Sequence, residues 1–181
     1  VQYSIDINDN SCISMKKNNA LENEFYSITI AENGSLTILD KENNKTYNNQ
    51  GILVENGDDG DSFNYSPPRK DMEILSTNSK FEYQIHGNDI YSKAQIHYTM
   101  IVPKDLEERA EHITSTTLPV TLEVGLRKGS KIIDFNVHVD NKGLSHRLCV
   151  IFDNQITSKF NYADQQFGLI KRPNYYEKEM N

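Results

Sequence analysis

The chain has 181 residues, a formal net charge of −7 at pH 7 and a hydrophobic fraction of 36%. This length fits one domain with a buried core, and the negative charge, without a Lys/Arg stripe, argues against nucleic acid or anionic lipid as a partner. The longest apolar runs, such as residues 148–152, are far shorter than the roughly 20 residues that cross a bilayer, so we expect no membrane segment.

The first 18 residues differ from the rest of the chain. Apolar and polar residues alternate over positions 3–7, and a polar Asn/Lys stretch follows. Such a stretch is typical of a linker, so we interpret residues 1–18 as the end of a preceding segment and place a boundary between Asn18 and Leu21. Because the chain begins without Met and without a signal pattern, we expect it to be part of a longer polypeptide.

The cysteine content bears on the cellular compartment. The two cysteines, Cys12 and Cys149, lie far apart in the sequence. One long-range bridge is conceivable, but two cysteines do not make the disulfide framework of a small secreted domain. We therefore expect the reducing cytoplasm as the location.

A β-hairpin is predicted around residue 34. Apolar residues occupy every second position over residues 26–30 and again over residues 36–38. The dipeptide Asn33–Gly34 lies between these two runs, and it tolerates the positive φ that hairpin turns require. We therefore expect two antiparallel strands joined by a turn at Gly34.

Longer strands are predicted in the middle of the chain. Apolar residues alternate with polar ones over residues 96–102, 120–126 and 133–139. A Lys-Gly-Ser turn at residues 128–130 separates the last two runs, so we expect these two strands to pair.

Two segments depart from this alternation. Residues 148–152 are continuously apolar, which predicts a strand covered on both faces and the most buried strand of the chain. Residues 106–113, shortly after Pro103, carry a helical turn within a connection. Many short strands separated by turns predict an all-β fold, an antiparallel β-sandwich with little helix, over residues 19–173, with a frayed tail at residues 174–181.

An acidic segment rich in glycine and aromatic residues, at positions 56–68, is the first candidate site. Carboxylates accept hydrogen bonds from sugar hydroxyls, glycines allow tight turns, and aromatic rings stack on pyranose faces. This composition predicts a carbohydrate-binding loop; a solvated polar loop with its aromatic side chains in the core is the alternative interpretation. The candidate sugar-contacting residues are Asp58, Asp59, Asp61, Phe63 and Tyr65.

Two patterns in the sequence imitate metal sites. The aspartates of the acidic segment offer oxygen ligands, but an EF-hand-like loop counted from Asp58 would need Glu where Arg69 stands. His138 and Asp140 share a strand face like a His-x-Asp zinc pair, yet zinc needs about three or four ligands and the alternation directs both residues to solvent. We therefore expect no zinc site in this chain and leave another oxygen-ligand site at the aspartates open.

A further group of motifs lies in the second half of the chain. Residues 140–148 read Asp-Asn-Lys-Gly-Leu-Ser-His-Arg-Leu, and residues 160–168 read Phe-Asn-Tyr-Ala-Asp-Gln-Gln-Phe-Gly. They follow Leu-Glu-Asn-Glu-Phe-Tyr at residues 21–26 and Leu-Arg-Lys-Gly-Ser at residues 126–130. The order of these motifs resembles the β-sandwich region of glycoside hydrolase family 38, the α-mannosidases, over roughly residues 20–173.

The resemblance implies a supersandwich of the kind seen in galactose mutarotases, packed against a zinc-bearing catalytic domain that is absent from this chain. That domain would cleave α-mannosides with retention of configuration, so the implied partners are an α-mannoside and the missing part of the polypeptide. We expect no catalytic residue and no cofactor in this chain. The loop would face the sugar, with Phe63 where many relatives carry Tyr and Tyr65 as the remaining aromatic hydroxyl, while Arg147 and Asp164 would hold loops in place.

Two other functions remain open. A free-standing carbohydrate-binding module would use Phe63 and Tyr65, with Tyr175 and Tyr176, as an aromatic platform. An aldose epimerase on the same fold would need a His acid and a carboxylate base in one cleft. The five histidines show no shared spacing with a particular Glu, and we expect most of them at the surface; they are His86, His97, His112, His138 and His146.

Overall fold

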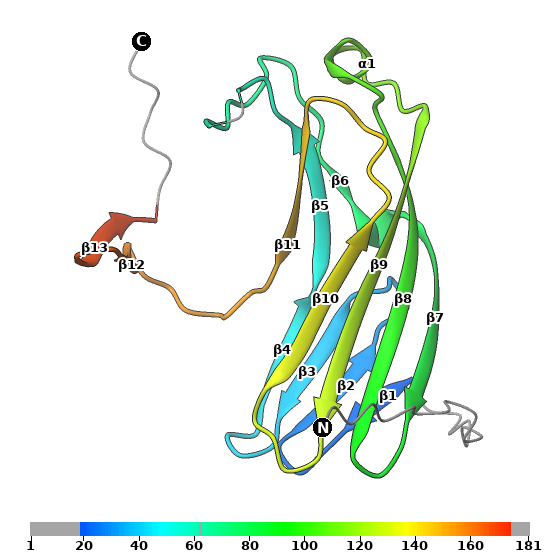
Figure 1. Ribbon diagram of the computed structural model, residues 1–181, viewed down its shortest axis with the longest axis vertical. Coiled ribbons are helices and arrows are strands. Elements are labelled where there is room, and N and C mark those ends of the chain that lie inside the picture. Colours follow the sequence, from blue (N-terminus) through cyan, green and yellow to red (C-terminus); the bar gives the residue numbers. More distant parts are fainter. Residues whose placement is uncertain (1–18, 62, 175–181) are drawn as a thin grey trace, which may run out of the picture.

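The computed structural model describes residues 19–61 and 63–174, and this part of the chain consists mostly of β-strands and their connections (Figure 1). Predictions made for residues 1–18 and 175–181 lie outside the described residues. Within the described ranges, no helix is long and apolar enough to cross a membrane. In chain order the elements are β1 (Ala20–Glu22), β2 (Tyr26–Ile30), β3 (Leu36–Asp40), β4 (Lys45–Gln50), β5 (Ile52–Gly57), β6 (Ile74–Leu75), η1 (Ser76–Asn78), β7 (Lys80–Gly87), β8 (Tyr91–Val102), α1 (Leu106–Ala110), β9 (Thr116–Arg127), β10 (Ile133–Val139), β11 (His146–Ile151), β12 (Phe160–Gln165) and β13 (Gly168–Pro173).

The strands β1 to β11 form two layers that pack face to face (Figure 1). One layer is the sheet β10-β9-β8-β7. The other layer contains the sheet β1-β2-β3-β4 and, beyond the end of β4, the sheet β11-β5-β6. The strand pairs of both layers are antiparallel. The predicted class, an all-β antiparallel sandwich with little helix, is confirmed.

The core lies between the layers and follows from the alternation along the two longest strands. Successive residues of a strand point to opposite faces, so every second side chain of β8 and β9 is buried. The facing layer contributes Ile28, Leu36 and Leu53 to the same cluster. The predictions for residues 96–102 and 120–126 are confirmed. The buried hydrophobic residues of β8 and β9 are Ala94, Ile96, Tyr98, Met100, Val102, Leu118, Val120, Leu122, Val124 and Leu126.

Both predicted hairpins form. β2 pairs with β3, and Gly34 in their turn has a φ of +83°. The Tyr98 hydroxyl of the opposite layer donates to the Gly34 carbonyl oxygen over 2.7 Å, which ties the turn to the core. β9 pairs with β10 as predicted, with Leu126 opposite Ile133. The expected helical turn is also present, as α1, and the Asp105 carboxylate caps its first N–H groups.

The prediction that residues 148–152 form the most buried strand was wrong, and the strand in this region, β11, ends at Ile151. β11 is an edge strand that pairs with β5. Leu148 and Val150 pack against the core, but Cys149 is exposed and Ile151 is 46% exposed. A continuous apolar run indicates that both faces of a strand are apolar, whereas cover on each face depends on which neighbours the fold supplies.

Candidate functional site

Three connections meet at the end of the sandwich where β5 ends and β11 begins (Figure 1). Backbone hydrogen bonds join them: the Asp58 N–H donates to the Ser145 carbonyl over 2.9 Å, and the Leu144 N–H donates to the Lys104 carbonyl over 3.0 Å. The predicted acidic loop is therefore held beside the other two connections. The connections are residues 58–73 between β5 and β6, residues 103–115 around α1, and residues 140–145 between β10 and β11.

The acidic loop (residues 58–66) is closed at its base by one of its own carboxylates. Asp58 Oδ1 accepts hydrogen bonds from the backbone N–H groups of Gly60 (2.9 Å) and Ser66 (3.1 Å). A side chain would not fit at Gly60, because its Cβ would lie 1.9 Å from the Asn64 carbonyl oxygen. One predicted sugar-contacting carboxylate thus has an oxygen occupied by the loop itself.

The tip of the acidic loop combines a second internal carboxylate with an open aromatic ring. Asp61 Oδ1 accepts hydrogen bonds from the N–H groups of Phe63 (2.8 Å) and Asn64 (2.9 Å), so this carboxylate also shapes the loop. The Phe63 side chain is 93% exposed, and Asp59 is exposed as well. Asp61 and Tyr65 are exposed too, but Asp61 is bonded within the loop and Tyr65 lies against Arg147. Sugar contact by any of the five residues stays a prediction.

Arg147 packs against the acidic loop from β11. Its guanidinium carbon lies 3.6 Å from the centroid of the Tyr65 ring, which is a cation–π contact. Its Nε donates to Asn56 Oδ1 over 3.0 Å, which fixes the guanidinium at the end of β5. Arg147 thus contacts the loop that it was expected to hold, and its importance for sugar binding stays a prediction.

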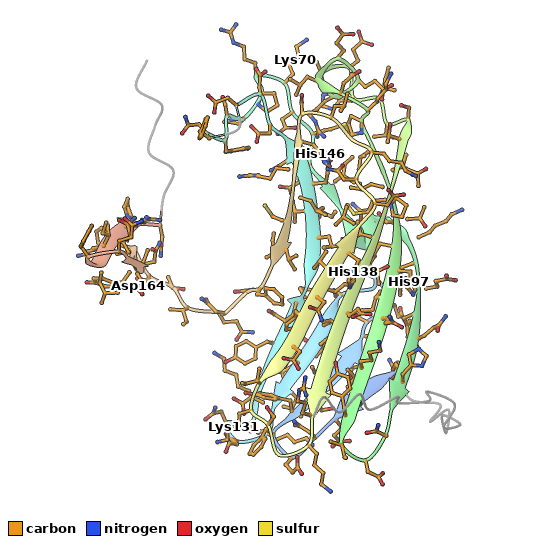
Figure 2. All side chains as sticks on the ribbon, viewed as in Figure 1. Lys70, His97, Lys131, His138, His146 and Asp164 are labelled. Atoms are coloured by element: carbon orange, nitrogen blue, oxygen red, sulfur yellow. The ribbon has the colours of Figure 1, made fainter. Side chains whose placement is uncertain are left out.

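Asp164 lies in a different part of the molecule. It is on β12, opposite Leu169 of β13, and these two strands pair with each other in a separate two-stranded sheet. Figure 2 shows Asp164 on this hairpin, away from His146 at the end of the sandwich where the acidic loop lies. The structure therefore does not bring Asp164 together with Arg147, and its expected role in holding a loop stays a prediction.

The pKa of Asp58 is lowered from its ordinary value of 3.8 by the N–H groups of Ser66 and Gly60 and by the charge of Arg147. A group with a depressed folded-state pKa stabilises the loop above the unfolded pKa, and this contribution is lost as the pH falls through the folded pKa. We expect the Gly60 and Ser66 amide shifts in NMR spectra to titrate together with a midpoint below 3.8.

In an Asp58→Asn variant this shared titration should disappear, because the group that titrates has been removed. A midpoint at or above 3.8 in the unmodified chain would show that the Asp58 carboxylate does not close the loop.

A buried ionic cluster lies beneath the loop, and the sequence interpretation missed it. Glu55 on β5 is 0% exposed and Arg109 on α1 is 1% exposed. Arg109 Nη2 forms an ion pair with Glu55 Oε1. Arg109 Nη1 donates to the Met72 carbonyl oxygen over 2.7 Å and lies 3.2 Å from Asp71 Oδ1. The guanidinium therefore joins a strand of the sandwich to the chain that leaves the acidic loop.

His146 completes this cluster. Its side chain is 4% exposed, and its Nδ1 lies 3.1 Å from Glu55 Oε1. Its Nε2 lies 2.8 Å from Asn141 Oδ1, an oxygen that also accepts the Gly143 N–H over 3.2 Å. In the tautomer with the hydrogen on Nε2, the ring donates to this Asn141 oxygen. His146 thus differs from His138, which lies along β10 with 70% of its side chain exposed (Figure 2).

The described residues do not fit a zinc site. Among them, no group of three or more His, Cys, Asp or Glu side chains is arranged to hold a metal ion. His138 and Asp140 are exposed, as the alternation predicted, and Asp140 pairs with Lys142 over 2.8 Å. We therefore derive no step through zinc from the residues of this chain.

An open hollow of about 550 Å³ lies at the opposite end of the sandwich, among the β1–β2, β7–β8 and β9–β10 turns. Its polar side chains take part in contacts that hold these turns. Lys41 pairs with Glu22 over 2.7 Å, and Glu24 accepts the Gly129 N–H over 2.9 Å. The hollow is therefore explained by turn structure, and the acidic loop remains the better candidate site.

The fold is an all-β sandwich, and comparison with protein families identifies the class of protein to which it belongs. Residues 21–181 match the family model described as "Glycosyl hydrolases family 38 C-terminal domain". The chain therefore belongs to glycoside hydrolase family 38, as the order of its motifs predicted.

Individual relatives agree with this membership. The chain is 26% identical over 173 residues to a Halalkalibacterium halodurans protein named "Putative mannosylglycerate hydrolase", covering 86% of this chain and 19% of that protein. A solved protein of glycosyl hydrolase family 38 from Enterococcus faecalis has 26% identity and a TM-score of 0.76, over 87% of this chain and 21% of its own. An alpha-mannosidase from Enterococcus faecalis V583 has 25% identity and a TM-score of 0.77, over 90% of this chain and 20% of its own. The chain thus spans about a fifth of the length of these relatives.

Proposed function

We propose that this chain is a non-catalytic β-sandwich domain of a glycoside hydrolase that cleaves α-mannosides, and that its acidic loop faces the sugar pocket. The observation that carries the proposal is the exposed Phe63 ring on a loop braced by Asp58, Asp61 and Arg147. An aromatic ring presented on a braced loop offers a face on which a pyranose can stack. Family membership and the names of the relatives support the substrate class.

Catalysis belongs, in this proposal, to the part of the enzyme that the chain does not contain. Zinc bound there would coordinate mannose hydroxyls and polarise the reacting sugar. The present chain would contribute binding: Phe63 has no hydroxyl, so it acts by stacking, and the open carboxylate of Asp59 accepts hydrogen bonds from sugar hydroxyls. We also propose a cytoplasmic location, which the low cysteine content supports.

The proposal predicts that Phe63→Ala, made in the complete hydrolase, raises KM for an α-mannoside about 3- to 10-fold with little change in kcat. This range corresponds to the roughly 0.5–1.5 kcal/mol of one aromatic stacking contact that ground state and transition state share. Steady-state kinetics with mannosylglycerate and with α-linked mannose disaccharides measures the effect. Ile90→Ala is the control, because Ile90 is also a largely exposed apolar residue, at 73%, but lies at the opposite end of the sandwich.

Three results would contradict the proposal. Binding of mannose oligosaccharides to the 181-residue chain alone in isothermal titration would favour a free-standing module. Faster anomer exchange in polarimetry would favour an epimerase. A complete coding sequence without a His-x-Asp pair followed by an acidic nucleophile would remove the enzymatic assignment.

A further inference from the structure

We infer that Arg109 is a positioning residue that holds the acidic loop from inside the sandwich, at the same strand end where Arg147 holds it from outside. The functional half of this inference rests on the proposed function, since it takes the acidic loop as the sugar-facing element. The structural half rests on contacts of the described residues alone.

The first argument is that Arg109 connects both ends of the loop segment. Asp71 Oδ1 accepts the Gly57 N–H over 3.0 Å, so the residue that precedes the loop is bonded to a residue that follows it. The Arg109 guanidinium contacts the same Asp71 oxygen and the Met72 carbonyl, while its other arm pairs with Glu55. The planar guanidinium of arginine directs its N–H donors to several acceptors in one fixed geometry, which the ammonium group of a lysine cannot do.

The second argument concerns free energy. Burying an ion pair costs desolvation that the mutual attraction of the two charges barely offsets, so packing alone would be served as well by apolar residues. The cost is increased here because Glu55 Oε2, Arg109 Nε and His146 Nδ1 lack hydrogen-bond partners within the described part of the chain. A cluster of this kind fits a role in fixing one loop geometry rather than in adding stability.

The third argument is the close fit around Gly57. A Cβ at this position would lie 2.6 Å from Arg109 Cδ and 2.6 Å from Pro68 Cγ. Because glycine has no side chain, Arg109 and Pro68 can pack directly against the backbone at the end of β5.

Gly57 also connects the inner and outer contacts. It pairs with His146 of β11, whose ring contacts Glu55 inside the sandwich, while the next residue, Arg147, stacks on Tyr65 outside it. The start of β11 thus places His146 against Glu55 on one face and Arg147 against the acidic loop on the other.

The test uses amide hydrogen exchange in the 181-residue chain carrying Arg109→Lys. Lysine keeps the charge near Glu55 but loses the fork, so exchange at Gly60 and Ser66 is expected to accelerate about tenfold, the effect of losing roughly one charge-assisted hydrogen bond. Core amides of β8 and β9 should keep their protection. Arg127→Lys is the matched control, because Arg127 makes an exposed ion pair with Asp134 at the opposite end.

Asp71→Ala provides a second variant that leaves the buried pair intact, and it should accelerate the same amides. Unchanged exchange at Gly60 and Ser66 in both variants would overturn the inference. An equal acceleration at every strand would also overturn it, because it would report only general destabilisation.

Kinetics of Arg109→Lys in the complete hydrolase separates the inference from the proposed function. A rise in KM with unchanged kcat, together with faster loop exchange, supports both. Faster loop exchange with unchanged KM supports the positioning role of Arg109 for the loop but refutes the assignment of that loop to the sugar.

Discussion

Replacement of Arg109 by methionine is expected to lower the free energy of unfolding by about 3–5 kcal/mol, because it leaves a buried carboxylate without its charged partner. Glu55 is fully buried, and one of its oxygens has no hydrogen-bond partner among the described residues. The remaining neighbour, His146, approaches only the oxygen that Arg109 already contacts. Urea unfolding followed by circular dichroism measures the loss.

Two further variants test whether the loss of stability comes from the unpaired buried charge. The double variant Glu55→Leu with Arg109→Met removes both charges, so it should recover most of the lost stability. Arg127→Met removes an ion pair that is 67% exposed at the arginine, and a loss below about 1 kcal/mol is expected. If Arg109→Met cost no more than Arg127→Met, the buried pair would not be a coupled unit.

Leu122→Ala is expected to cost about 2–5 kcal/mol through the cavity left between the two layers. Leu122 is 0% exposed on the central strand β9, between Ile96 of β8 and Val137 of β10. Its Cδ2 lies 3.1 Å from the position that a Cβ would take at Gly51, the residue between β4 and β5. The side chain therefore fills the space where the two sheets of the facing layer join.

The control for this second prediction is Thr117→Ala, on the same strand but on the exposed face, with an expected change within about 0.5 kcal/mol. Both variants are compared by thermal and urea unfolding. Equal effects at Leu122 and Thr117 would mean that the layers do not pack on each other along β9.

The strands that alternation predicted well are those with one face in the core. β8 and β9 satisfy this condition, and their period of two identifies which side chains are buried, whereas on β10 the apolar residues Val137 and Val139 are 38% and 39% exposed. The prediction for β11 failed because its apolar residues occupy both faces. The pattern carries no information about whether a second layer covers each face. Leu148 and Val150 face the core, so Cys149 and Ile151 lie on the opposite face of the strand, where they are exposed.

The candidate site was predictable only in its surface part. Acidic, glycine and aromatic residues are concentrated within one short segment, so composition alone locates the loop. The cluster beneath the loop comes from residues far apart in the chain: Glu55, Asp71, Arg109 and His146. One signal was available, since Glu55 directly follows the apolar run Ile52–Val54, and a carboxylate in a buried strand requires a partner.

The sequence by itself determined the all-β class, the hairpins and the faces of the central strands, because these depend on residues within a few positions of one another. The tertiary structure decided which strand lies at an edge and which charges share a buried site. It also decided which carboxylates of the acidic loop accept hydrogen bonds from the backbone of the loop itself. These features depend on contacts between distant segments, and a buried charge can be assigned a partner only when the fold has brought the two together.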